Sequence, residues 1–351
     1  MPSKSTLNLL IACPLAFQAS TMLGEMKTGG DVEINIDSTS LKTESPDKTI
    51  PGLPIGGDGS FFLMSNYKEG SLYAEGKIGG YASLDGNVGT EDVYVKIGSD
   101  AWDVTAGYFE AADLYGWGQD TIISSVNGIF APNEARGRAA GAVMGQYHVG
   151  GAATLQLNIV AASDSVDETV GEATTTHGLQ VTGIRPVAII TPMKALAVTL
   201  GAEMITKKPS DNVVKWERAH NNVGGNIKYM AEMFDAGVSF GSQTVSGKTF
   251  ADTDIDETSQ TSFGLYGTFK IKSAGDVGVG YFMSTAKDGM ETGETTMTDT
   301  AGYLAYNMAV GKQTWVKLGL SQGSAKAEVD GSDASSTVTK TTFRLRLAHN
   351  L

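Results

Sequence analysis

The most constraining feature of this sequence is an alternation of apolar and polar residues that recurs in short segments from about residue 32 to the end. In one such segment Leu155, Leu157 and Ile159 share one side of an extended chain, while Gln156 and Asn158 share the other. A period of two is the pattern of a β-strand, because successive side chains point to opposite faces. The sequence therefore predicts an all-β protein.

The segments number 16, and an even count suits an antiparallel barrel closed by hairpins. Short turns alternate with polar stretches that we expect to be long outer loops: Ser163–His177, Lys208–Asn222, Lys248–Ser259, Lys287–Asp299 and Glu328–Thr339. Short periplasmic turns and longer outer loops are typical of outer-membrane barrels. No linker or shift of composition divides residues 23–351, which predicts a single transmembrane antiparallel β-barrel.

The two faces of the strands differ in chemistry. Side chains such as Val93, Val95 and Ile97 are expected to meet lipid, together with Leu155, Leu157 and Ile159. The opposite face carries charges, and a barrel of this size has a lumen too wide for side chains to fill, so the charges are expected to line water. Aromatic girdles at the two membrane interfaces are expected from Tyr67, Tyr94, Trp102, Tyr108, Tyr147, Tyr229, Tyr303 and Trp315.

Bulk composition excludes several classes of protein. The chain has 26 basic and 39 acidic residues and a net charge of −13, which argues against a nucleic-acid partner, since phosphate contacts need clustered Lys and Arg. Apart from the N-terminus, no apolar run approaches the ~18 residues that a transmembrane helix requires. The acidic surplus lies mainly in the expected outer loops and predicts a channel with a weak preference for cations.

The N-terminus has the composition of an export signal, which we place at residues 1–22. Lys4 supplies the positive end, an apolar stretch follows from Leu7 to Ala19, and Ser20 adds a small residue near the expected cleavage site. Cys13 is the only cysteine. It ends a short lipobox-like sequence, so lipid attachment at Cys13 is an alternative to simple cleavage.

One connection differs from the others. Residues 110–134 are too long for a hairpin turn, and their second half is apolar at Ile122, Ile123, Val126, Ile129 and Phe130. Apolar side chains left in water would forgo the free energy of burial, so this loop is expected to fold against the inner wall and narrow the pore. Tyr115 and Trp117 are expected to help pack it there, and sugar stacking is an alternative role for these aromatic residues.

Charged residues near this loop are the candidates for a pore constriction. Acidic groups on the loop and basic groups on the wall would create a field across a narrow opening that orients dipolar solutes. The candidate residues are Glu110, Asp113, Asp120, Arg136, Arg138, Lys96 and Lys77. Arg136 and Arg138 are expected at the start of the strand that follows the loop.

These segments resemble the general porins of Gram-negative bacteria. Residues 91–108, EDVYVKIGSDAWDVTAGY, are similar to the family's fourth and fifth strands, and the end of the chain, from Phe343 to Leu351, resembles its terminal assembly signal. The family usually ends in Phe, and its Pro-Glu-Phe-Gly-Gly-Asp loop motif is absent here, so no loop residue is carried over. The resemblance implies a homotrimeric diffusion channel for ions and small hydrophilic solutes, surrounded by outer-membrane lipid and lipopolysaccharide.

Catalysis is not expected from this sequence. The four histidines, His148, His177, His220 and His349, lie in no recognisable catalytic or metal-binding motif, and His177 and His220 fall in expected outer loops. The scattered glycines form no phosphate-binding loop, and we expect no cofactor. Two alternatives to a general porin stay open: a porin selective for sugars or anions, and a β-rich surface protein without a channel.

Overall fold

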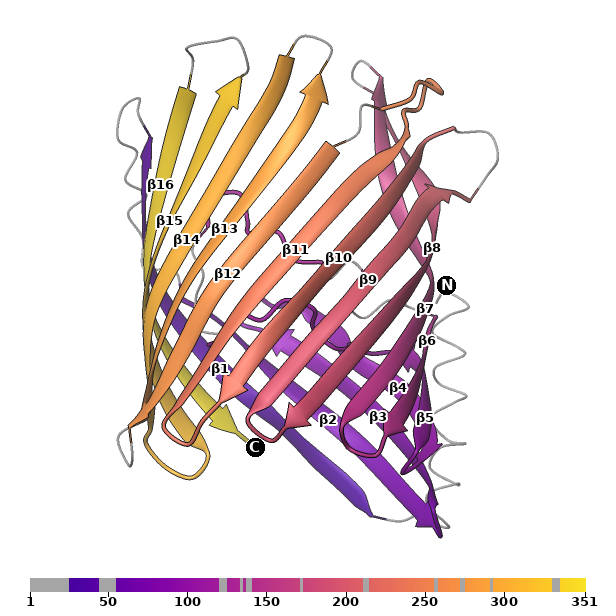
Figure 1. The fold of residues 1–351 in the computed structure, drawn as a ribbon, viewed down its shortest axis with the longest axis vertical. Helices are drawn as coiled ribbons and strands as arrows, with labels where there is room; N and C mark the ends of the chain where they lie inside the picture. Colours follow the sequence, from indigo (N-terminus) through magenta and orange to yellow (C-terminus); the bar gives the residue numbers. More distant parts are fainter. Residues whose placement is uncertain are drawn as a thin grey trace.

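The computed structural model describes residues 25–43, 55–119, 125–132, 135–136, 141–170, 173–210, 215–255, 258–271, 275–290, 293–329 and 335–351. Within them 16 strands form one closed antiparallel barrel, in which neighbours in sequence pair with each other and the first strand pairs with the last (Figure 1). The predicted 16-stranded antiparallel barrel is confirmed. The described residues contain no helix whose length and hydropathy would allow it to cross a membrane.

The strand bounds are β1 Met26–Thr43, β2 Ile55–Glu69, β3 Leu72–Ser83, β4 Val88–Ser99, β5 Trp102–Tyr108, β6 Ala142–Val149, β7 Ala153–Val170, β8 Ala173–Met193, β9 Leu196–Pro209, β10 Glu217–Met230, β11 Phe234–Lys248, β12 Thr258–Ile271, β13 Gly275–Met290, β14 Gly293–Ala309, β15 Thr314–Val329 and β16 Ser335–Asn350.

Several expected outer loops are in fact strands. β7 continues to Val170 and β8 begins at Ala173, and Val166 pairs with His177 in the ladder between them. Most of the expected loops in β9–β10, β13–β14 and β15–β16 are paired in the same way. Thr favours strands, and the two backbones satisfy each other even where both faces meet water, so polarity alone was a poor guide to where the strands end.

The side chains are arranged inside out compared with a soluble barrel. On β7, Leu155, Leu157 and Ile159 are exposed on the outer surface, whereas Gln156 and Asn158 are buried on the inner side. The same alternation exposes large apolar side chains around the barrel. This is the arrangement of a protein whose outer surface meets hydrocarbon and whose interior is polar.

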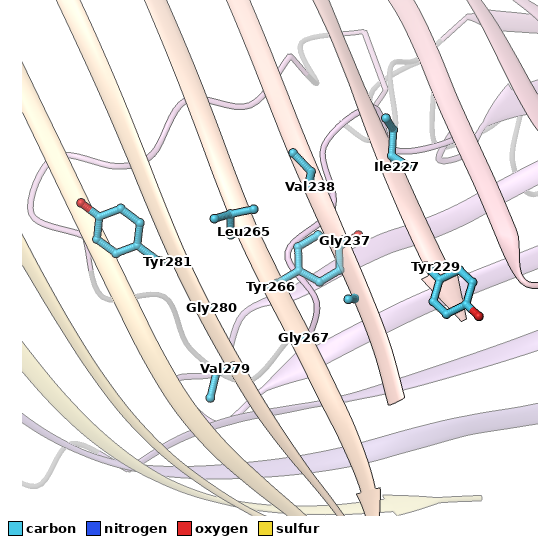
Figure 2. Close-up of a pocket in the computed structure, with 11 residues that line it drawn as sticks. Ile227, Tyr229, Gly237, Val238, Leu265, Tyr266, Gly267, Val279, Gly280 and Tyr281 are labelled. Carbon is cyan, nitrogen blue, oxygen red and sulfur yellow. The ribbon is translucent and has the colours of Figure 1, made fainter. Parts of the chain in front are cut away.

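The outer surface has an apolar depression over β10 to β13 (Figure 2). Ala236 and Gly267 are direct partners in the β11–β12 ladder, and their small size leaves a gap between larger neighbours such as Tyr229, Leu265 and Tyr281. The large side chains around the gap are on the outer face, as their exposure shows. This depression therefore lies outside any path through the lumen.

The wall of the barrel differs in height around its circumference. β5 has 7 residues and β6 has 8, whereas β8 has 21. In Figure 1 the violet strands from β2 to β6 occupy the lower part of the barrel, and the strands from β8 to β15 rise well above them. The low wall coincides with the point where the chain leaves β5 and enters the long connection to β6.

Candidate functional site

The connection between β5 and β6 turns into the barrel and runs along its inner wall; Figure 1 shows it as a thin violet trace behind β10 to β13. Its outgoing limb, residues 109–119, is held by wall side chains. The Ser239 hydroxyl on β11 accepts a hydrogen bond from the Gly116 N–H at 2.9 Å and donates one to the Gly116 carbonyl at 2.7 Å. The Tyr303 hydroxyl on β14 does the same for the Gln119 N–H at 3.0 Å and the Trp117 carbonyl at 2.9 Å.

An aromatic cluster fixes this limb. Tyr115 is fully buried, its ring lies 4.7 Å from that of Trp117, and the Trp117 ring lies 5.1 Å from that of Phe282 on β13. Phe282 in turn stacks on Tyr303 at 6.2 Å. The expectation that Tyr115 and Trp117 pack the loop against the wall is confirmed, whereas Tyr303 was wrongly assigned to an interfacial girdle.

The returning limb, of which residues 125–132 and 135–136 are described, follows the wall back. The Ser125 carbonyl accepts from Lys340 on β16 at 3.4 Å, the Asn127 N–H donates to Asp299 on β14 at 3.1 Å, and the Phe130 N–H donates to Ser284 on β13 at 3.3 Å. The loop therefore lies inside the barrel, as the apolar residues in its second half predicted. Ile122 and Ile123 lie outside the described residues.

Glycines on the inner wall make room for both limbs. A Cβ atom at Gly224 on β10 would lie 2.3 Å from the Pro132 ring, and one at Gly201 on β9 would lie 2.6 Å from Leu114. Gly278 on β13 faces Gln119 in the same way. Glycine weakens a strand interior, and it often marks a place where another part of the chain approaches closely. Here the loop is the part that approaches, and the glycines form its seat.

A buried ion pair anchors the loop where it joins the barrel. Arg185 on β8 donates to Glu203 on β9 at 2.7 Å, and both side chains are 0% exposed. Neither residue was among the constriction candidates that the sequence suggested. The sequence signal for Arg185 is a charge next to Pro186 inside an otherwise apolar stretch.

The expected constriction residues of the loop are neighbours of one another. Arg136 forms ion pairs with Glu110 at 3.1 Å and Asp113 at 2.9 Å. Arg136 lies in the returning limb, and the next strand begins only at Ala142, so its expected position at a strand start was wrong. These charges sit together where the two limbs meet the wall, at residues 110–113 and 135–136, which we call the neck of the loop. They do not face one another across an opening.

The two lysines lie on the wall of the low strands. Lys77 on β3 forms an ion pair with Asp92 on β4 at 2.6 Å, and its amine lies 5.1 Å from the centre of the Phe62 ring. Lys96 is the register partner of Glu75 in the β3–β4 ladder. Asp120 and Arg138, the other two candidates, lie outside the described residues.

Two arginines on β16 also face the lumen and were not among the candidates. Arg344 forms a two-pronged pair with Asp37 on β1, with both N–O distances 2.6 Å, and Arg346 pairs with Glu33 at 3.1 Å. Their joint occurrence in the β1–β16 ladder depends on barrel closure, which brings residues about three hundred positions apart into register.

The histidines are dispersed among different strands. His148 bonds Asp103 at 2.9 Å and Thr154 at 3.1 Å, His177 bonds Glu168 at 3.0 Å, and His220 bonds Gln243 at 2.8 Å. His349 bonds Thr314 at 2.9 Å. His177 lies in β8 and His220 in β10, so their assignment to outer loops was wrong.

Comparisons with known proteins agree with this architecture. The chain matches no family model and no curated protein sequence. Among solved structures, the trimer form of OmpT from Vibrio cholerae is 12% identical, with a TM-score of 0.62 over 92% of this chain and 99% of that one. The outer-membrane channel DcaP of Acinetobacter baumannii is 12% identical, with a TM-score of 0.65 over 93% and 97%. The anion-selective porin from Comamonas acidovorans is 13% identical, with a TM-score of 0.60 over 93% and 99%. At this level of identity the likeness shows the fold, and the fold is the outer-membrane β-barrel of the porins.

Proposed function

We propose that this protein is an outer-membrane channel for passive diffusion of ions and small hydrophilic solutes, narrowed by the connection between β5 and β6. The observation that carries the proposal is the loop seated inside an inside-out barrel. A barrel with apolar side chains outside and polar ones inside fits a membrane around it and water within it. A segment that lies along part of the inner wall is expected to reduce the cross-section of the lumen and to leave a water path along the opposite wall.

The water path is proposed to follow the part of the wall that the loop leaves open. This part comprises β1 to β4 and the segment of β16 around Arg344 and Arg346, and Lys77, Asp92 and Lys96 also face inward there. Charged groups of both signs along a polar path favour water and hydrophilic solutes over apolar ones. Solutes that depend on hydrogen bonds for hydration would therefore pass more readily than apolar solutes of equal size.

We propose that the constriction is formed by the loop neck and the facing wall. The seven residues assigned to it are Glu110, Asp113, Asp120, Arg136, Arg138, Lys96 and Lys77. Arg136 is paired with two acidic side chains, Glu110 and Asp113, so these three groups of the neck carry a net charge of −1. The net charge of −13 then favours a weak preference for cations. Anion selectivity, the property named for the Comamonas porin, is the competing outcome.

A homotrimer is proposed from the low wall. Spanning a bilayer takes about 9–11 residues per tilted strand, more than β5 and β6 supply. Their outer surface nevertheless exposes Trp102, Val143 and Tyr147. Neighbouring subunits could cover this low apolar wall, and the similar OmpT structure is a trimer form. Lipid and lipopolysaccharide would surround the higher remainder.

Residues 1–22 are proposed to be an export signal, and residues 23–351 to be a single barrel unit. Lipid attachment at Cys13 is the alternative processing route, and mass measurement of the mature N-terminus distinguishes the two. We propose no catalytic role, because the four histidines bond different partners on separate strands and do not converge.

Planar-bilayer recording of the purified protein under a salt gradient tests the proposed function. We expect discrete conductance steps, an ohmic current that grows with salt concentration, and a small reversal potential of cation-selective sign. A correctly folded protein that produces no conductance steps would exclude a channel and favour the β-rich surface protein. Clear anion selectivity would keep the channel and overturn the assigned charge preference.

A further inference from the structure

The two limbs of the loop are bonded to each other at its neck, where both meet the barrel wall. The Ala111 N–H donates to the Arg136 carbonyl at 2.9 Å, and the Arg136 guanidinium donates back to the Ala111 carbonyl at 3.3 Å. These contacts join the limbs to each other, but they do not determine where the joined neck sits on the wall.

The buried wall pair supplies that position. Arg185 donates through a second nitrogen to the Ala112 carbonyl of the outgoing limb at 2.6 Å. Glu203 accepts from the Ala135 N–H of the returning limb at 3.2 Å. The pair itself is joined at 2.7 Å, so one charged unit holds both limbs at once.

Neighbouring strands complete this anchor. Asn222 on β10 donates to the second oxygen of Glu203 at 3.0 Å, and Asn158 on β7 donates to the Ala135 carbonyl at 2.9 Å. The carboxylate thus receives bonds from two strands and from the loop. Even with such bonds, a buried ion pair often stabilises a protein no more than apolar residues of similar volume would. The presence of this pair therefore points to a role beyond barrel stability.

Building on the proposed channel function, we infer that Arg185 and Glu203 act together as positioning residues that set the seat of the loop neck and thereby the width of the channel. Neither residue needs to touch a solute. Their effect is transmitted through the carbonyl of Ala112 and the N–H of Ala135. The pair Asp37 and Arg344, with N–O distances of 2.6 Å on the open side of the barrel, provides a matched control.

The test measures the position of the loop by cysteine labelling and, separately, the conductance of the channel. The reporter is a single cysteine at Ala135→Cys, chosen because Ala135 is almost fully buried in the seated loop. Cys13→Ser removes the only other cysteine. Its labelling rate with a water-soluble maleimide is measured in the refolded full-length barrel. The variants are Glu203→Gln, the double variant Arg185→Met with Glu203→Leu, and the control Asp37→Asn.

We expect Glu203→Gln and the double variant each to raise the labelling rate at least severalfold, and to increase current noise and the mean conductance in bilayers. Asp37→Asn should leave labelling unchanged. The double variant leaves no unpaired buried charge, so it separates loss of the anchor from a charge penalty on folding.

Unchanged labelling in both anchor variants, with heat-modifiable migration showing a folded barrel, would overturn the inference. Faster labelling with no change in conductance or noise would overturn the assigned effect on channel width and leave the anchor itself. A parent protein that does not conduct, but whose anchor variants label faster, would overturn the proposed function and not the anchor.

Discussion

The inner wall of this barrel has two regions of opposite character. Under the loop, β9 to β13 present glycine, serine and aromatic residues, for example Gly224, Ser239 and Tyr266. On the open side, the facing strands carry paired charges such as Asp37 with Arg344 and Lys77 with Asp92. One region is shaped to receive protein and the other to receive water. The same strand pattern of inward polar residues therefore serves two purposes, and only the size and charge of those residues distinguish them.

Removing the loop should change conductance more than any other substitution, because it would open the covered wall to water as well. Deletion of Leu114–Phe130 is expected to raise single-channel conductance severalfold and to increase the size limit for neutral solutes. The barrel should stay folded, since its strand ladders are continuous without the loop. Conductance and polymer exclusion in bilayers measure the effect. A folded deletion variant with unchanged conductance would mean that the loop does not narrow the channel.

Unlike either inner region, the outer face of β7 is expected to meet lipid. Leu157→Arg places a charge on the surface assigned to lipid and should destabilise the folded barrel by roughly 2–4 kcal/mol if it lies near the membrane midplane. Reversible folding into lipid vesicles measures the free energy of unfolding. The inward neighbour substitution Gln156→Glu serves as a control. A loss well below 1 kcal/mol for Leu157→Arg would indicate that this surface is not in hydrocarbon.

The glycine seat can be tested by a single methyl group. At Gly224 a Cβ would meet the Pro132 ring at 2.3 Å, so Gly224→Ala should displace the returning limb at a cost of about 1–3 kcal/mol. At Gly76 on β3 a Cβ has open space, and Gly76→Ala should be neutral or slightly stabilising. Labelling at Ala135→Cys reports the displacement. Equal labelling rates in the two alanine variants would show that Gly224 is not needed to seat the loop.

The smallest effect is expected from a single charge on the open wall. Lys96→Gln removes one positive charge beside the proposed path and should shift the reversal potential by a few millivolts toward stronger cation preference. The isosteric Glu75→Gln on its register partner should shift it in the opposite direction. Measurements at low salt enlarge both shifts, because screening weakens with falling ionic strength. Shifts of the same sign would show that neither side chain faces the ion path.

Much of the fold could be predicted from the sequence because alternation is a local property. Leu155, Leu157 and Ile159 reveal their common face without knowledge of any other strand. The extent of the strands could not be predicted as well, since the pairing of Val166 with His177 depends on a partner backbone and not on hydropathy. The closure between β1 and β16, and the pairs it creates, likewise requires the whole barrel.

The site was predictable only in outline. The apolar residues of the second half of the loop, such as Phe130, indicated correctly that it folds inward. The position of Arg136 beside Glu110 and Asp113 could not be read from spacing, because an irregular loop has no period. Gly224 and Arg185 gained their meaning only through the register of β8 to β10, which places them under the loop. A glycine in a strand is otherwise indistinguishable from one near a turn.

Solutes are expected to pass along the open wall and not along the covered one. Substituted-cysteine recording distinguishes the two paths, with Lys96→Cys on the open wall and Ser239→Cys under the loop, each in the Cys13→Ser background. A bulky charged methanethiosulfonate reagent is added during bilayer recording. We expect a stepwise fall of current at Lys96→Cys and no change at Ser239→Cys. A fall at Ser239→Cys with none at Lys96→Cys would show that solutes follow the covered wall instead.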